Sequence, residues 1–180
     1  MTTKYPNLFR PGSIAGLDVR NRVIKSPQGT ATGNIDGTVS ARTVGHYRRL
    51  GEGGCGLVMV EYTYMDEDAS KSLHNQLGLS RREHVAGMGW LVDEVHSTGA
   101  KVGLQLNHTG RQRFIGTLPI KSASTSSWDE VEPMEGNKPV AMTIAEIKKV
   151  AEDFGVAAAR ARDARFDLVE TGGGASSSTV

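Results

Sequence analysis

The side chains best placed for chemistry lie in one short segment, Gln105-Leu106-Asn107-His108-Thr109-Gly110-Arg111. The segment overlaps the end of an apolar run at 101–106, which is typical of a buried strand. Gln105 brings a carboxamide, a group that both donates and accepts hydrogen bonds. His108 and Arg111 follow within six positions. These residue types are suited to hold a polar ligand at a strand end, or only to brace the loop that follows, and the pattern alone leaves both interpretations open.

The spacing of the remaining residues gives little support for a metal site, a redox cysteine or a dinucleotide-binding loop. Four histidines lack the separation expected of metal ligands: His46, His74, His84 and His96. Cys55, the single cysteine, stands in a Gly-rich strand entrance and is expected to be a buried small residue rather than a redox centre. Residues 27–33 contain no Gly-x-Gly-x-x-Gly pattern, which argues against a dinucleotide fingerprint. Lys25 ends a predicted buried strand, an unusual place for a cation, and the sequence does not reveal its partner.

Strands and helices alternate along the chain and must position these groups. Apolar runs predict strands at 22–26, 56–61, 101–106 and 166–170. Apolar stripes at helical spacing predict helices at 41–52, from 81 to just before Gly99, and at 144–163. Ser40 is a good N-cap for the first helix, and Ser80-Arg81-Arg82-Glu83 and Thr143-Ile144-Ala145-Glu146 both fit a capping box. Residues 13–21 fit a β-hairpin that turns at Ala15-Gly16.

This order of elements predicts an α/β fold with a parallel sheet and right-handed crossovers. A doubly wound sheet and a (β/α)8 barrel both begin in this way, and the missing dinucleotide fingerprint favours the barrel. The polar stretch 107–139 between the third strand and the last helix is long for a compact domain, which is typical of a functional or disordered loop.

Composition excludes several classes of function. The chain carries 21 Lys and Arg against 20 Asp and Glu, for a net charge of +1, so neither a nucleic-acid partner nor a membrane partner is expected. The single cysteine permits no intrachain disulfide. The first ten residues contain no apolar core of a secretory signal, and a cytoplasmic location is the expectation.

Several blocks, in the right order, resemble Old Yellow Enzyme-type NADH:flavin oxidoreductases. The segment 105–111 is similar to the family's Gln-Leu-x-His-x-Gly-Arg block, and it is the most specific of them. Ser26-Pro27, the run 56–61 and the run 166–170 resemble the ends and interiors of that family's first, second and fourth barrel strands. The resemblance implies a (β/α)8 TIM barrel of which this chain is an incomplete N-terminal half, with about four βα strands and an N-terminal β-hairpin. Residues 1–170 would form that half, and 171–180 a Gly/Ser-rich tail.

The resemblance also implies a cofactor and its contacts. The family binds FMN at the carboxyl mouth of the barrel and takes reducing equivalents from NADH or NADPH. Pro27, Gln28 and Gly29 would line the flavin at the end of the first strand, and Gln105 would pair with its pyrimidine edge. Tyr62 would be a further cofactor-binding residue, while His108 and Arg111 would support either the loop or the flavin. Two of these positions depart from the family: Gly29 stands where many members carry Thr or Cys, and Tyr62 where a small residue often packs.

A larger departure follows Glu170. The family continues with a His-x-x-His/Asn-x-Tyr-like pattern that polarises the substrate carbonyl, whereas residues 171–180 hold neither His nor Tyr. The later strands, which supply an Arg and the phosphate cradle in the family, are also missing.

Two hypotheses remain open on the sequence. In the first, the protein is an FMN-dependent oxidoreductase that passes hydride from NAD(P)H to a small activated alkene such as an enone or enoate. In the second, this chain alone is a non-catalytic half-barrel that binds flavin weakly, forms homo-oligomers, or assembles with a complementary C-terminal half. Two open sheet edges would favour such association.

Overall fold

A computed structural model describes residues 4–116, 119–126 and 138–173. Its helices are α1 (Pro6–Phe9), α2 (Ala41–Glu52), α3 (His84–His96) and α4 (Ile144–Asp163), with a short 3-10 helix, η1 (Gly110–Gln112). Its strands are β1 (Gly12–Ile14), β2 (Leu17–Val19), β3 (Ile24–Lys25), β4 (Leu57–Tyr64), β5 (Lys101–His108), β6 (Lys121–Ser122), β7 (Val140–Ala141) and β8 (Leu168–Gly173).

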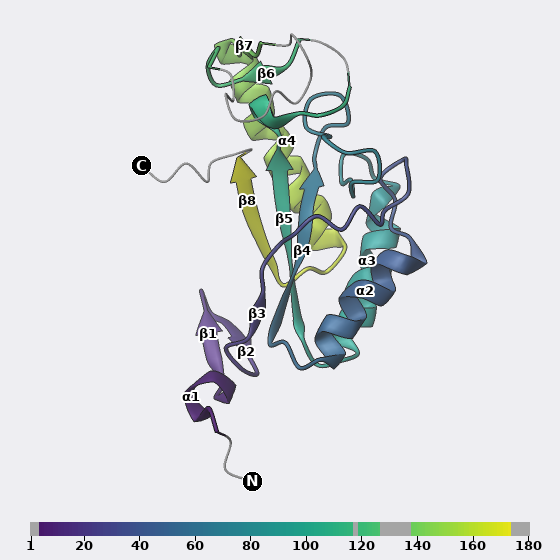
Figure 1. The fold of residues 1–180 in the computed structure, drawn as a ribbon, viewed down its shortest axis with the longest axis vertical. Coiled ribbons are helices and arrows are strands. Elements are labelled where there is room, and N and C mark those ends of the chain that lie inside the picture. Colours follow the sequence, from purple (N-terminus) through teal and green to yellow (C-terminus); the bar gives the residue numbers. More distant parts are fainter. Residues whose placement is uncertain (1–3, 117–118, 127–137, 174–180) are drawn as a thin grey trace.

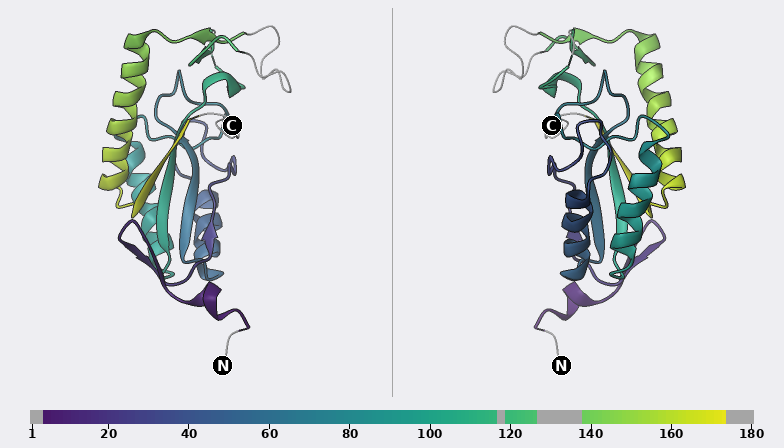
Figure 2. Two further views of the ribbon diagram at one scale, coloured as in Figure 1. Left: turned by 90° about the vertical axis from the view of Figure 1, so that its left-hand side faces the viewer. Right: turned by 90° about the vertical axis from the view of Figure 1, so that its right-hand side faces the viewer.

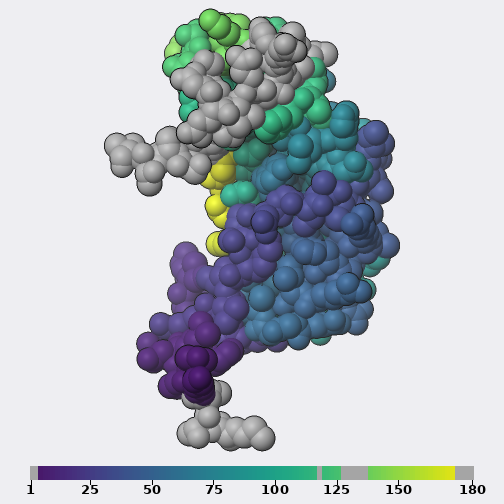
Figure 3. Space-filling model, in the orientation of Figure 1, coloured from purple at the N-terminus to yellow at the C-terminus, as the bar shows by residue number. Residues whose placement is uncertain are grey.

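A four-stranded parallel sheet forms the centre of the described residues, in the order β3-β4-β5-β8. All its strands point the same way, so their carboxyl ends meet at one edge, with β6 and β7 beyond it (Figure 1). The antiparallel β1–β2 hairpin lies near the opposite end. In Figure 3 the first segment of the chain projects from that lower end of the molecule. The predicted parallel α/β arrangement is therefore confirmed.

The main core lies between the sheet and α2, α3 and α4. Side chains of β4 and β5 with alternate spacing, among them Val58, Val60, Val102 and Leu104, pack with the buried stripe of α3. Figure 2 shows α4 running beside the sheet as a separate layer. A smaller cluster, formed by Val19 with Leu57 and Met59 and flanked by Ile14 and Leu168, ties the hairpin to the opposite face of the sheet.

Two helix starts follow the sequence prediction. The Ser40 hydroxyl accepts a hydrogen bond from the Thr43 N–H at 3.1 Å and begins α2. Thr143 and Glu146 form the expected reciprocal capping box of α4. Each of these caps involves residues only three positions apart, so both can be predicted from the sequence alone.

The predicted capping box at Ser80–Glu83 is wrong. Helix α3 begins only at His84, and its N-cap Glu83 makes no side-chain hydrogen bond. The cause is a contact that is distant in sequence: Arg160 Nη1 of α4 donates to the carbonyl oxygens of Leu79 and Ser80, at 3.1 and 2.8 Å. That contact holds the chain before α3 in place, and the buried Ser80 hydroxyl has no partner in the described part of the chain.

Strand lengths also differ from prediction. The first strand is only Ile24–Lys25, because the Asn21 carboxamide accepts from the Val23 N–H and donates to the Gly54 carbonyl, which holds the preceding residues outside the ladder. Strands β4, β5 and β8 each run two or more residues further than their apolar runs. The last of them extends to Gly173, which pairs with His108. The predicted tail at 171–180 otherwise lies outside the described residues.

Candidate functional site

The inner face of the sheet, away from the helices, presents polar groups toward the carboxyl ends of its strands. A Cβ built on Gly103 would meet Met59 and Leu168, which places these three residues together on that face. Since side chains alternate along a strand, Gln105 and Glu170 follow two positions later on the same face. The carboxyl edge of a parallel sheet is where α/β folds bind their ligands.

Gln105 is the best-positioned of the residues predicted from sequence. It pairs in register with Glu170, and its Nε2 donates to the Glu170 carboxylate at 3.0 Å. A Cβ on Gly172 would lie 3.4 Å from the Gln105 carboxamide, so that side chain extends past bare backbone. The sequence offered no sign of the Glu170 contact, because it depends on the register of two strands 65 residues apart.

Gly29 and Tyr62 come into direct contact. A Cβ at position 29 would lie 2.5 Å from Cε1 of the Tyr62 ring, closer than real Cβ atoms come to another atom. In the sequence these two positions are separate departures from the family, and the structure shows that they are in contact. Gln28 lies beside Gly29 on the loop after β3, and Pro27 precedes both and is half-buried.

Glu61 fixes this loop against the sheet and was not singled out by sequence. The Glu61 carboxylate is 1% exposed and accepts from both the N–H and the hydroxyl of Thr30. Burial raises the pKa of this carboxyl, although the Thr30 hydrogen bonds and the charge of Lys25 oppose the rise. The Glu61 backbone N–H donates a hydrogen bond to the hydroxyl oxygen of Tyr47 in α2, at 2.8 Å. A lone acid within an apolar strand is the signal that could have identified it.

His108 braces the loop after β5. Its side chain is 6% exposed and its Nδ1 accepts from the Gly110 N–H at 3.2 Å. Burial lowers the pKa of this imidazole, so its neutral form is favoured. The neighbouring Thr109 hydroxyl donates to the Ser70 carbonyl, and Arg111 lies half-buried in η1. Of the two predicted roles for His108, loop support is the one that these contacts favour.

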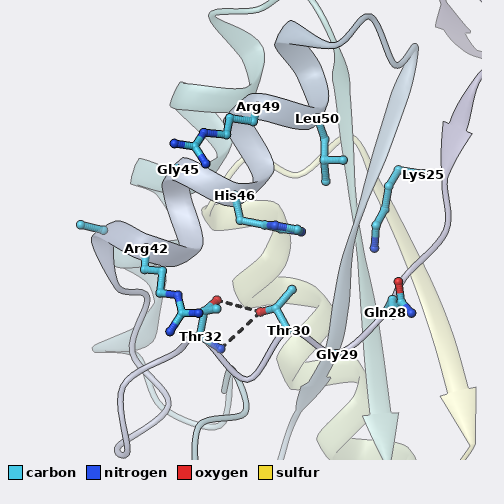
Figure 4. A pocket seen from close by; sticks show the side chains of 11 residues that line it. Lys25, Gln28, Gly29, Thr30, Thr32, Arg42, Gly45, His46, Arg49 and Leu50 are labelled. Atoms are coloured by element: carbon cyan, nitrogen blue, oxygen red, sulfur yellow. Dashed lines mark hydrogen bonds between the residues drawn. The ribbon is translucent and has the colours of Figure 1, made fainter.

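A groove of about 690 Å³ lies between α2 and the end of β3, lined by Lys25, Gln28, Gly29, Thr30, Thr32, Ala41, Arg42, Gly45, His46, Arg49 and Leu50. Figure 4 shows His46 of α2 extending toward Lys25, with Gln28 and Gly29 on the loop beyond. Among the described residues, the buried Lys25 Nζ and His46 Nε2 have no hydrogen-bond partner. Burial lowers the pKa of both groups. Arg42 and Arg49 also line the groove, and its lining residues include no Asp or Glu, so the groove is basic in composition and lies beside the open edge of β3.

A parallel sheet backed by helices, with a carboxamide, a phenol and glycines gathered where its strands end, defines an α/β protein whose polar groups lie at the carboxyl edge, the edge at which folds of this class bind ligands. The chain belongs to the NADH:flavin oxidoreductase / NADH oxidase family, whose model matches residues 7–176.

Individual relatives and solved structures agree with this assignment. The chain is 36% identical to an NADH oxidase of Thermoanaerobacter brockii over 177 residues, covering 95% of this chain and 26% of that protein. It is 37% identical to an NADPH dehydrogenase of Listeria welshimeri over 166 residues, covering 91% and 47%. It superposes on Old Yellow Enzyme from Pichia sp. AKU4542 with a TM-score of 0.82 and 25% identity, covering 92% and 45%. It superposes on morphinone reductase in complex with tetrahydroNAD with a TM-score of 0.80 and 26% identity, covering 92% of this chain and 49% of that one.

The chain thus spans between a quarter and about half of the length of these relatives. Within residues 4–116, 119–126 and 138–173, no helix is both long and apolar enough to cross a membrane. In the same part of the chain, no group of three or more His, Cys, Asp and Glu residues could hold a metal ion.

Proposed function

We propose that this chain contributes the flavin-facing strands of an FMN-dependent NAD(P)H oxidoreductase, whose substrate is a small activated alkene such as an enone or enoate. The observation that carries the proposal is the position of Gln105, inward-facing near the carboxyl end of β5. The activities for which the relatives are named, NADH oxidase and NADPH dehydrogenase, support the choice of reductant class.

The residues at this edge fit a flavin in kind. The Gln105 carboxamide offers a donor and an acceptor to a ring edge that alternates the two. The loop after β3 offers backbone groups at Gln28 and Gly29, and Gly172 leaves bare backbone beside Gln105. Bound FMN supplies hydride transfer from NAD(P)H to the substrate, while these residues hold and orient it.

The first experiment is a visible absorption spectrum of the protein after incubation with FMN and desalting. Retained flavin absorbance is expected, together with a loss of affinity of about tenfold in Gln105→Ala, the magnitude of one good hydrogen bond. Asn7→Ala is the matched control, because it removes an exposed carboxamide in α1 at the far end of the molecule. An unaltered protein that retains no flavin would count against the proposal.

A second candidate function is assembly with a complementary polypeptide, in which this chain alone is a non-catalytic half-barrel. Its support is the basic groove at the open β3 edge, where two buried nitrogen atoms lack partners in the described residues. A segment that adds a strand to β3 and presents a carboxylate to Lys25 and His46 would give both nitrogen atoms a hydrogen-bond partner. A second copy of this chain is the competing occupant.

Light scattering coupled to size exclusion distinguishes these states. A mixture of this chain with a polypeptide equivalent to the relatives' C-terminal half is expected to elute as a one-to-one complex. A homodimer would identify the second copy as the occupant, whereas a monodisperse monomer in the mixture would contradict the assembly candidate.

A further inference from the structure

Tyr62 occupies a bulge in β4, where the strand changes register against β5. Val60 pairs with Leu104 and Thr63 pairs with Leu106, so that two residues, Glu61 and Tyr62, lie opposite Gln105 alone. A bulge of this kind re-aims side chains and is frequent next to binding sites. The bulge therefore sets the direction of Tyr62 at the same level of the sheet as Gln105.

The Tyr62 ring fills the space in which a side chain at position 29 would lie. A Cβ on Gly29 would stand 2.5 Å from Cε1 and 2.7 Å from the hydroxyl oxygen of Tyr62. Gly29 does not have a left-handed backbone, so its conformation does not require glycine. Position 29 requires glycine because of the Tyr62 ring, since any larger residue would displace the phenol.

The phenol is a neutral hydrogen-bond donor. Burial, and secondarily the charge of Glu61, raises the pKa of Tyr62, so the hydroxyl keeps its proton at neutral pH. The Gln76 carboxamide donates to the Tyr62 backbone carbonyl at 3.2 Å and anchors the strand, while the Glu61 carboxylate is engaged by Thr30. Within the described residues the Tyr62 hydroxyl makes no hydrogen bond, so its donor is available to a ligand.

We propose that Tyr62 donates a hydrogen bond to the bound cofactor from the β3 side of the site, and that Gly29 is glycine in order to admit the Tyr62 ring. The inference rests on the proposed flavin-binding function. A flavin gains negative charge when it is reduced, and a fixed neutral donor stabilises that form more than the oxidised form. Tyr62 would thus contact the cofactor directly and shift the balance between its two redox forms.

The test compares Tyr62→Phe with the unaltered protein. Phenylalanine keeps the ring against Gly29 and removes only the hydroxyl. The dissociation constants of oxidised and photoreduced FMN are measured by fluorescence and absorbance, and the preference for the reduced form is expected to fall about tenfold, as for one hydrogen bond. Tyr5→Phe, at an exposed tyrosine in the first segment, is the matched control and leaves the ratio unchanged.

A second pair of variants tests the role of Gly29 without any flavin. Gly29→Ala is expected to lower the urea midpoint because its Cβ meets the Tyr62 ring, and the same substitution in a Tyr62→Ala background is expected to lower it less, because the ring is then absent. Additive effects in the double variant would overturn the steric part of the inference.

The outcomes separate this inference from the proposed function. If the unaltered protein retains no FMN, the proposed function and the role of Tyr62 both fail. If it retains FMN and Tyr62→Phe binds both redox forms with the unaltered ratio, only the role of Tyr62 fails.

Discussion

Asp167 joins three elements through one carboxylate. Its Oδ2 accepts from His96 Nε2 at 2.6 Å and from the Val102 N–H at 2.9 Å, and its Oδ1 accepts from Lys101 Nζ at 3.0 Å. Burial raises the pKa of Asp167, but these hydrogen bonds outweigh burial and hold the pKa below its usual 3.8. The carboxylate therefore links the end of α3 and the start of β5 to the residue before β8.

Asp167→Asn is expected to reduce the free energy of unfolding at pH 7 by about 1–3 kcal/mol, since it removes a charged acceptor of three hydrogen bonds. A folded pKa below the unfolded value means that the stabilisation is present above about pH 4 and is lost as the pH falls through the folded pKa. Urea unfolding at pH 7, 4 and 3 measures this, and the variant should show the flatter profile. Asp163→Asn, at a half-exposed carboxylate, is the control. Parallel profiles for Asp167→Asn and the unaltered protein would contradict the prediction.

His84 contributes to a second and less acidic pH window, together with His46 and His108, whose pKa values burial also lowers. It is 1% exposed beneath the Tyr64 ring, and burial lowers its pKa below 6.5. Because the unfolded state takes up the proton first, stability is complete above about pH 6.5 and declines as the pH falls through the folded pKa. Urea unfolding at pH 8, 6 and 5 should show the decline, and His84→Gln should reduce it. The exposed His74 supplies the control variant His74→Gln, which should leave the decline intact.

At the scale of elements, the sequence predicted the helix and strand ends that depend on contacts between residues close together in the chain. The N-caps of α2 and α4 were predictable because each capping hydroxyl and the backbone N–H that donates to it lie within three residues. The start of α3 was not readable, because Arg160 of α4 fixes the chain before it from 80 residues away. Strand β4 outran its apolar run because Thr63 and Tyr64 resume pairing with β5 beyond a bulge, and only that pairing reveals the extension.

Alanine substitutions at two glycines, Gly155 and Gly56, are expected to change the free energy of unfolding in opposite directions. Gly155 lies exposed in the interior of α4, and a Cβ there would meet no atom within 4 Å. Gly155→Ala is expected to raise the free energy of unfolding by about 0.5–1 kcal/mol, because alanine loses less conformational entropy in a helix. In contrast, a Cβ on Gly56 would lie 2.4 Å from the Asn21 carbonyl oxygen, and Gly56→Ala should lower stability by about 1–3 kcal/mol. Thermal and urea unfolding of both variants checks the pair, and equal signs would refute it.

At the scale of the whole molecule, the alternation of strands and helices sufficed to predict the parallel sheet and the edge at which its polar residues gather. That logic placed Gln105 near the end of a strand, and the family resemblance supplied its predicted contact with the flavin. The pairing of Gln105 with Glu170, the fit of Tyr62 on Gly29 and the engagement of Glu61 by Thr30 join segments 31 to 65 residues apart. No local pattern encodes such contacts, because they depend on strand register and loop closure together.

Lys25 lies in the groove beside the open edge of the sheet, and a substitution there can test whether a partner docks at that edge. Its ammonium is buried in the groove beside α2 without a hydrogen-bond partner in the described residues, and burial lowers its pKa despite the nearby charge of Glu61. An unpaired buried cation destabilises the fold, whereas a carboxylate supplied by a docked segment would offset that cost.

Lys25→Met is therefore expected to act in opposite directions on folding and on assembly. For this chain alone it should raise the free energy of unfolding at pH 7 by about 1 kcal/mol, because methionine fills the same space without a charge. In the proposed complex it should weaken association with the complementary polypeptide about tenfold, because the partner carboxylate then loses its cation. Urea unfolding and titration calorimetry measure the two effects, with the exposed Lys148→Met as control. A variant that gains stability and binds the partner as tightly as the unaltered chain would place the docking surface elsewhere on the molecule.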